Sequence, residues 1–196
     1  MKNEYSLSET LSTAYALILT KIFYKGARLI RRPFYCRGIS RLQFAEGLTT
    51  GHCCRFDLLG KDDDNSKKLI IGKNCKIGDN VHIVANENVV IGDNCLMASK
   101  IFISDTNHGD YSNEKNDSSP DVPPDARPLY TKPVSIGNNV WICESVCILP
   151  GVRIGNGCII GANAVVNKDI PNNSIATGSP ARVIKIYDTK KGMWLL

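Results

Sequence analysis

The chain has 196 residues, enough for one domain with short appendages but too few for two well-packed globular halves. Its 24 Lys and Arg against 19 Asp and Glu give a mild net charge of +5, which we take as spread along the chain and not indicative of a nucleic-acid partner. Eight cysteines without a CxxC pair or a signal peptide argue against a zinc site and a disulfide framework, and favour reduced thiols in the cytoplasm.

The amino-terminal segment mixes apolar and basic residues and predicts a helix that ends before Pro33. Its most apolar stretch, residues 14–19, is far shorter than the about 20 residues that a membrane-spanning helix requires. We expect segment 1–35 to be a helical appendage. It either packs against the rest of the chain, the favoured alternative, or lies on a membrane surface with its cations facing anionic headgroups. The residues that carry this expectation are Leu17, Ile18, Ile22, Phe23, Lys25, Arg28, Arg31 and Arg32.

From residue 71 onward an aliphatic residue recurs every six positions, with Gly, Asn or Asp close behind it. A period of six fits neither an amphipathic helix nor a long alternating strand, so each unit is predicted to be a short strand followed by a turn. Three units would form one triangular rotation of the chain, and stacked rotations would pair each strand with its copies above and below. The residues that open the units are Ile71, Ile77, Ile83, Ile91, Met97, Ile103, Ile136, Ile142, Ile148, Ile154, Ile160 and Val166.

The fifth position of each unit is small and is also predicted to point inward. This makes Cys75, Cys95 and Cys158 core residues rather than catalytic or metal-binding ones. The turns use Gly, Asn and Asp, which adopt left-handed backbone conformations more readily than other residues. The adjacent Cys53 and Cys54 have no assigned role. The sequence therefore predicts an all-β fold of stacked parallel strands without a metal site.

A long loop, residues 109–133, interrupts the repeat and is rich in Pro, Ser, Asp and Asn. The chain has three histidines, His52, His82 and His108, and the last of them ends the hexad directly before this loop. A loop held by a rigid scaffold is a favourable position for a catalytic residue. We expect the loop to form a wall of a substrate pocket.

These hexads, with NHG at 107–109, NNVWI at 138–142 and GSPARVIK at 178–185, resemble the hexapeptide-repeat acetyltransferases, including galactoside and maltose acetyltransferases, over about residues 70–186. The strings SKIFISDTNHG, RPLYTKPVSIG and VCILPGVRIGNG are most similar to the O-acetyltransferases of lipopolysaccharide and other surface polysaccharide pathways. The resemblance implies a left-handed parallel β-helix over residues 36–186, a tail at 187–196, and a homotrimer with active sites between neighbouring chains. The left-handed winding rests on the resemblance alone, because parallel crossovers are usually right-handed.

The resemblance also implies that His108 is the general base, which removes a proton from a sugar hydroxyl as that hydroxyl attacks the thioester of acetyl-coenzyme A. Asp105 would either orient the imidazole or cap a turn, and the sequence leaves both open. Galactoside and maltose enzymes carry Asn at the position of Gly78. His82 or Asn80 would therefore replace that Asn in contacting the acceptor.

A second set of residues matches the family's cofactor site. A backbone amide at Cys143 or Glu144 is the expected oxyanion donor, although most relatives have Gly at the position of Cys143. Trp141 matches the family's aromatic residue near the cleft. Cations near the carboxy-terminal end would contact the phosphates of coenzyme A. The positions implied for coenzyme A are Ala162, Asn167, Lys168, Arg182 and Lys185.

The sequence therefore predicts an acetyl-CoA-dependent O-acetyltransferase that acts on a sugar hydroxyl in the biosynthesis of lipopolysaccharide O-antigen or another surface polysaccharide. An N-acetyltransferase acting on an amino sugar or nucleotide sugar, and a non-catalytic β-helix scaffold, are the alternatives. We expect a cytoplasmic homotrimer, including at the inner face of the membrane, with acetyl-CoA and a carbohydrate as partners and without nucleic acid or metal. The fold does not specify which sugar or which hydroxyl is used.

Overall fold

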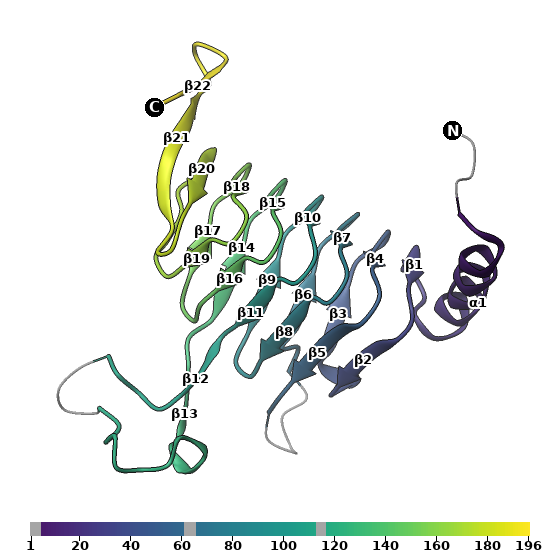
Figure 1. Cartoon of the computed structure of the whole chain (residues 1–196), viewed down its shortest axis with the longest axis horizontal. Coiled ribbons are helices and arrows are strands. Elements are labelled where there is room, and N and C mark those ends of the chain that lie inside the picture. The colour runs from purple at the N-terminus through teal and green to yellow at the C-terminus, as the bar shows by residue number, and fades with distance from the viewer. Residues whose placement is uncertain (1–4, 61–65, 113–116) are drawn as a thin grey trace.

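The computed structural model describes residues 5–60, 66–112 and 117–196, which consist mostly of short parallel strands with one α-helix at the amino-terminal end (Figure 1). Helix α1 (Leu7–Phe23) starts at a capping box, in which the Ser6 side chain accepts a hydrogen bond from Glu9 N–H and the Glu9 carboxylate accepts one from Ser6 N–H. Within these described ranges, no helix is long and apolar enough to cross a bilayer.

After α1 the chain visits three parallel sheets in a fixed rotation, A then B then C, so that strands one rotation apart pair with each other. We call residues 29–177 the coil. Sheet A contains β1 (Leu29–Ile30), β4 (Thr49–Thr50), β7 (Lys76–Ile77), β10 (Leu96–Met97), β15 (Trp141–Ile142), β18 (Ile159–Ile160) and β20 (Ser174–Thr177), then the antiparallel β21 (Arg182–Asp188) and β22 (Met193–Leu195). Sheet B contains β2 (Phe34–Arg37), β5 (Cys54–Leu58), β8 (His82–Ala85), β11 (Phe102–Ser104), β16 (Cys147–Ile148) and β19 (Val165–Val166). Sheet C contains β3 (Leu42–Phe44), β6 (Leu69–Ile71), β9 (Val89–Ile91), β14 (Val134–Ile136) and β17 (Arg153–Ile154).

Between sheets B and C the rotation is interrupted once by an antiparallel hairpin, β12 (Thr106–His108) and β13 (Leu129–Thr131), which projects away from the coil in Figure 1. Short 3-10 turns at Ile39–Arg41 and Pro124–Ala126 complete the described elements. Strands β1 and β2 already pair with β4 and β5. Parallel pairing therefore begins at Leu29, inside segment 1–35, which the sequence predicts to be a helical appendage.

The residues that open the hexads form the core, as the repeat predicts. Strand register stacks them in one column per sheet, and each of them exposes at most 4% of its surface. Column A holds Ile77, Met97, Ile142 and Ile160, column B holds Ile83, Ile103, Ile148 and Val166, and column C holds Ile71, Ile91, Ile136 and Ile154. Phe56 extends column B toward the amino-terminal rotations, where Phe34 packs edge-on against it. Apolar burial along these columns is therefore the main stabilising contribution.

Asparagine is the most frequent non-glycine residue at the left-handed turn positions. Five of these asparagines, Asn74, Asn80, Asn94, Asn139 and Asn163, have φ between 56° and 59°, in the left-handed region that Asn tolerates better than most residues. Side chains from one rotation also accept hydrogen bonds from backbone amides of the rotation before. Asn156 Oδ1, for example, accepts from Asn138 N–H at 2.7 Å. These contacts lock the corners in register.

The cysteines are free thiols. The predicted core cysteines also satisfy their S–H groups, because Cys75, Cys95 and Cys158 each lie 3.0–3.1 Å from a carbonyl oxygen of the next rotation. Cys54 has the same role, with its Sγ 3.1 Å from Gly78 O, whereas Cys53 supplies a corner with φ of 55°. The adjacent pair is thus one core residue and one turn residue.

Helix α1 protects the edge strand at the amino-terminal end of sheet A. The Thr20 hydroxyl is fully buried, donates to Ala16 O at 2.7 Å and accepts from Ile30 N–H in β1 at 2.8 Å. An edge strand with free N–H groups is open to unwanted pairing, and this hydroxyl closes one such position.

Replacing Thr20 with the isosteric Val should lower the free energy of unfolding by about 1.5 kcal/mol, because Ile30 N–H stays buried without an acceptor. Urea denaturation of the variant beside Thr10→Val, in which an exposed hydroxyl is removed, measures the effect. Equal stability of the two variants would contradict the role assigned to Thr20.

Candidate functional site

The hairpin β12–β13 carries His108 at the end of β12, opposite Leu129. The imidazole is exposed, while its backbone is held firmly. His108 O accepts a hydrogen bond from the Tyr111 hydroxyl at 2.8 Å, and Arg127 Nη1 donates to that hydroxyl at 2.6 Å. Arg127 Nε also donates to Val122 O at 2.8 Å, which ties the loop together. The loop therefore presents an accessible imidazole on a fixed support.

Gly109 allows this geometry. Its φ is +105°, and an added Cβ would lie 2.6 Å from the Tyr111 hydroxyl and 2.8 Å from Ser118 Oγ. A larger residue would displace the contact that fixes the His108 carbonyl. The glycine in the NHG string thus has a packing reason as well as a conformational one.

The Asp105 carboxylate binds backbone amides, as in the turn-capping alternative. It is fully buried and accepts from the N–H groups of Asn86, Glu87 and Asn88 at 2.8–3.1 Å. The Thr106 hydroxyl donates to it as well, at 2.6 Å. Asp105 therefore joins the root of the hairpin to the preceding rotation of the coil, and its carboxylate oxygens are already occupied by these donors.

His82 also has a partner away from the hairpin. Its Nε2 donates to Asp57 Oδ2 at 2.9 Å in the neighbouring strand β5, and its ring packs on Phe102 with centroids 5.4 Å apart. Arg55 Nε binds the same oxygen at 2.7 Å, and Arg37 Nε lies 3.6 Å from Asp57 Oδ1. A hollow of about 470 Å³ adjoins this cluster.

Burial by itself would raise the pKa of Asp57, but the hydrogen bonds from His82 and Arg55 and the Arg55 charge hold it below its usual value. A depressed folded-state pKa stabilises the fold above the unfolded-state pKa of about 4, and this contribution is lost as pH falls through the folded-state pKa. The stability difference between wild type and Asp57→Asn should therefore be constant near neutral pH and shrink below about pH 4. Urea titrations across this range measure it, and a difference that grows on acidification would contradict the assignment.

Asn80 and Gly78 lie in the turn from sheet A to sheet B. Asn80 N–H donates to His52 O at 2.8 Å, with φ at 56°. A Cβ at Gly78 would lie 2.6 Å from Ala98 backbone atoms, so the close stacking of the rotations favours glycine at this position.

The turns from sheet A to sheet B, which we call the A–B edge, also hold Cys143, Glu144 and Ala162. Cys143 N–H already donates to Ile160 O at 2.9 Å, so this amide, one of the two expected oxyanion donors, is engaged in the sheet. The Glu144 carboxylate accepts from Ser99 N–H at 2.8 Å. Burial raises the pKa of the Cys143 thiol, which disfavours a nucleophilic thiolate there.

Trp141 lies next to this edge, on the outer face of sheet A. The residue is 48% exposed and is flanked in register by Leu96 and Ile159. The indole is therefore available to a ligand or to another chain. Lys185, in β21 of the same sheet, pairs with Ile175.

The turns from sheet B to sheet C, the B–C edge, hold the hairpin with His108 and also Asn167 and Lys168, which follow β19. Ala181 N–H donates to Val165 O at 2.8 Å at the start of β19, and Arg182 opens β21 beside Thr177, at the A–B end of sheet A. Strands β19, β16 and β11 are neighbours, so two strand spacings, about 10 Å, separate Lys168 from the root of the hairpin.

The candidate residues thus form two groups in one chain. Asn80, Cys143, Glu144 and Ala162 lie on the A–B edge, and His108, Asn167 and Lys168 lie on the B–C edge. The width of sheet B, on the order of 15 Å at ~3.3 Å per residue, separates the two edges. A single chain does not bring the candidate base and the candidate oxyanion amide together.

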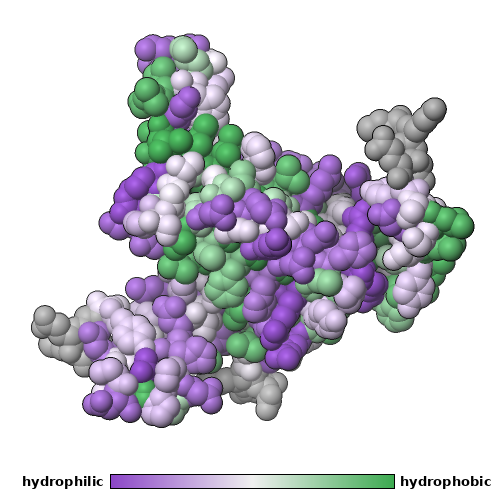
Figure 2. Space-filling view, in the orientation of Figure 1, coloured by the Kyte–Doolittle hydropathy of each residue, from purple (hydrophilic) through white to green (hydrophobic). Residues whose placement is uncertain are grey.

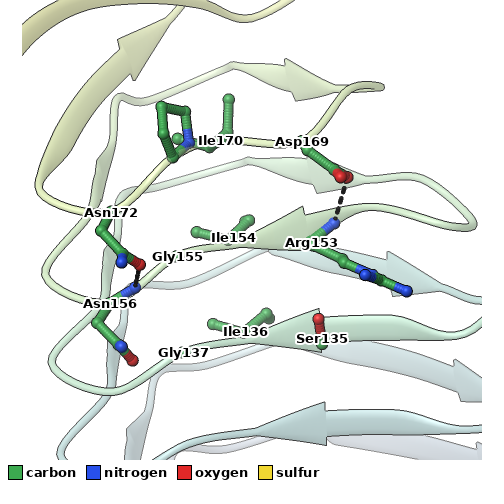
Figure 3. Close-up of a pocket in the computed structure, with 11 residues that line it drawn as sticks. Ser135, Ile136, Gly137, Arg153, Ile154, Gly155, Asn156, Asp169, Ile170 and Asn172 are labelled. Atoms are coloured by element: carbon green, nitrogen blue, oxygen red, sulfur yellow. Dashed lines mark hydrogen bonds between the residues drawn. The ribbon is translucent and has the colours of Figure 1, made fainter.

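An open groove of about 640 Å³ lies on sheet C near its carboxy-terminal end (Figure 3). It forms because the sheet stops there, with Ile170 making an isolated bridge to Ile154. Asp169 Oδ1 accepts from Arg153 N–H and Asn172 Oδ1 from Asn156 N–H, both at 2.8 Å (Figure 3). The sequence did not single out these residues, because their spacing is that of ordinary repeat turns. In the described part of the chain, no cluster of three or more His, Cys, Asp or Glu could hold a metal ion.

Comparisons with known proteins agree on one family. The model "Bacterial transferase hexapeptide (six repeats)" matches residues 133–168, and "Hexapeptide repeat of succinyl-transferase" matches residues 68–99. The chain is 39% identical over 194 residues to the putative lipopolysaccharide biosynthesis O-acetyl transferase WbbJ of Escherichia coli K12, covering 99% of this chain and 96% of the relative. It is 41% identical over 115 residues to galactoside O-acetyltransferase from the same organism, covering 59% and 52%.

Solved structures are similar over nearly the whole chain. Galactoside acetyltransferase in complex with coenzyme A aligns with a TM-score of 0.57 at 27% identity, covering 99% of this chain and 90% of that one. AntD, an N-acyltransferase from Bacillus cereus, aligns with a TM-score of 0.68 at 22% identity, covering 97% and 94%, which shows a shared fold. Since one relative is 39% identical and is matched over 96% of its length, the chain belongs to the hexapeptide-repeat acetyltransferases and is an acyltransferase.

Proposed function

We propose that this chain transfers the acetyl group of acetyl-coenzyme A to a hydroxyl group of a sugar during the synthesis of lipopolysaccharide or another surface polysaccharide. The observation that carries the proposal is the exposed His108 imidazole on a hairpin whose backbone is fixed by Tyr111, Arg127 and Asp105. The relative named for lipopolysaccharide O-acetylation supports the acceptor class, and the galactoside acetyltransferase complex supports coenzyme A as the donor.

In this mechanism the neutral His108 imidazole accepts the hydroxyl proton while the sugar oxygen bonds to the thioester carbonyl carbon. The carbonyl oxygen becomes an oxyanion, for which a preorganised backbone N–H is the economical donor. Glu144 N–H is the remaining candidate, because Cys143 N–H is engaged with Ile160 O. When the intermediate collapses, the C–S bond breaks and the thiolate of coenzyme A takes the proton back from the imidazolium. The products are an acetyl ester and free coenzyme A.

The donor would lie along sheet B. Lys168 follows β19 on the B–C edge, and Arg182 opens β21 beside Thr177 on the A–B edge. The two cations flank sheet B at the carboxy-terminal end of the coil, where they can pair with phosphates. The pantetheine arm, contacted by Ala162 or Asn167, would then reach toward the hairpin. Lys185, in β21 of sheet A, would add a third cation for the phosphates at the carboxy-terminal end of the coil.

We further propose that the active site forms between copies in a homotrimer, wound as left-handed β-helices, as in the family. The separation of the two edges supports this, because the A–B edge of one chain would have to meet the hairpin of the next. Mixing two inactive variants tests it. His108→Ala and Ala162→Trp, co-assembled in equal amounts, should regain activity at about a quarter of the interfaces if sites are shared, and none if each site is built within one chain.

Thiol release from acetyl-coenzyme A, measured across free sugars, amino sugars, nucleotide sugars and surface polysaccharides, tests the function itself. Turnover that depends on a hydroxyl-bearing sugar, with an ester product that mild base removes, supports the proposal. An amide product on an amino sugar would establish N-acetylation instead. If no carbohydrate in the panel stimulates thiol release, the assignment of a sugar acceptor is wrong.

A further inference from the structure

Helix α1 contacts the coil through a narrow line of small side chains and directs its large apolar side chains outward. Ala16 and Thr20 are 2% and 0% exposed. The opposite face follows helical spacing, with residues four or three positions apart. It consists of Leu7, Leu11, Tyr15, Ile18 and Ile22, each between 58% and 77% exposed. Figure 2 shows apolar surface along the outer side of this helix. Burial against the coil therefore does not explain the apolar residues.

The positive charge of the chain is concentrated around this helix, which corrects the expectation that it is evenly spread. Residues 10–45 hold seven Lys and Arg and no Asp or Glu, whereas the rest of the chain has 17 basic residues against all 19 acidic ones. Lys21, Lys25 and Arg28 are exposed, and none of them forms a salt bridge with another described residue. An apolar face bordered by unpaired cations is complementary to an anionic, partly apolar surface.

A hollow between α1 and the coil is a third, independent feature. Its volume is about 600 Å³, and Tyr15, Leu19, Phe23, Tyr24, Ile39 and Arg32 line it. The Arg32 guanidinium lies 5.3 Å from the Tyr24 ring centroid, and its buried Nε has no hydrogen-bond acceptor among the described residues. A mostly apolar hollow with one cation in its wall is complementary to the acyl chain and anionic headgroup of a lipid.

From these three features we propose that α1 and this hollow dock on an anionic lipid bilayer. Leu11, Ile18 and Ile22 would enter the boundary between headgroups and acyl chains, with the helix lying in the membrane plane. Lys21, Lys25 and Arg28 would face lipid phosphates, and Arg32 would gain its missing acceptor. The surface lies at the opposite end of the coil from the basic cofactor residues, as the positions of α1 and β21 in Figure 1 show, so docking leaves that end in solution.

Vesicle co-sedimentation of the full-length protein tests the proposal without reference to catalysis. Wild type should sediment with vesicles of equal parts phosphatidylcholine and phosphatidylglycerol, much less with pure phosphatidylcholine, and less as salt is added. Ile18→Glu combined with Ile22→Glu should lower the bound fraction about tenfold or more. Both side chains are exposed, so circular dichroism and thermal unfolding should show an intact fold.

The carboxy-terminal hairpin provides matched controls, because it also carries exposed apolar and basic residues. Ile184→Glu with Ile186→Glu, and Lys190→Gln with Lys191→Gln, should leave vesicle binding unchanged, whereas Lys21→Gln with Lys25→Gln should weaken it. The proposal fails if wild type stays in the supernatant or if the hairpin variants alone lose binding. It also fails if the α1 variant only reduces the oligomer size in sedimentation velocity, which would make this face a contact between copies.

Discussion

Replacing His108 with alanine is expected to lower acceptor-dependent thiol release by about 10²-fold or more, the usual contribution of a general base. A sugar hydroxyl is a poor nucleophile at neutral pH, and the hairpin presents this imidazole exposed at the end of β12. The loss should appear in kcat, while the affinity for coenzyme A stays within a factor of about two, because the proposed phosphate contacts lie elsewhere. Steady-state kinetics and calorimetric titration with coenzyme A measure the two quantities.

His52→Ala is the matched control. His52 is exposed in the turn before β5, and its Nδ1 donates to Arg32 O at 2.6 Å. Removing it takes away a histidine without touching the hairpin, so turnover should stay close to wild type. If His108→Ala keeps wild-type turnover, or if both variants lose it equally, another group is the base.

The repeat made most of the fold predictable. An aliphatic residue every six positions determines which side chains share a column, so the twelve core positions could be assigned without coordinates. Cys54 escaped this assignment because the rotations before residue 71 depart from the regular hexad, with Thr50 and Phe56 taking two of the column positions. Local spacing predicts a core only where the repeat is regular.

The candidate site was less predictable, because its contacts are made between rotations that lie far apart in sequence. Asp105 meets amides 17–19 residues earlier, and His82 meets Asp57 25 residues earlier. Family resemblance aligned each residue singly and implied a site between chains, but it did not assign the residues to the A–B and B–C edges. Only the order of the sheets shows that His108 and Glu144 lie on different edges of one chain.

Replacing Asp105 with alanine should have the largest effect on stability. Its carboxylate is fully buried and accepts from three consecutive backbone amides of residues 86–88 and from the Thr106 hydroxyl. Alanine would leave these partly buried donors without their acceptor, which should lower the free energy of unfolding by about 3 kcal/mol. Asp105→Asn keeps one acceptor oxygen but turns an NH₂ group toward the amides, so we expect roughly half of that loss.

The same change should separate support of the hairpin from proton transfer. With the root of β12 loosened, kcat of Asp105→Asn should fall, but the apparent pKa in its pH–rate profile should stay at the wild-type value, because the carboxylate binds amides and not the His108 imidazole. Urea denaturation and the pH dependence of kcat/KM measure the two effects. A pH–rate profile that shifts in Asp105→Asn, with unchanged stability, would instead mean that Asp105 reaches the imidazole during catalysis, and the hairpin would then have to move away from the amides of residues 86–88 in each turnover.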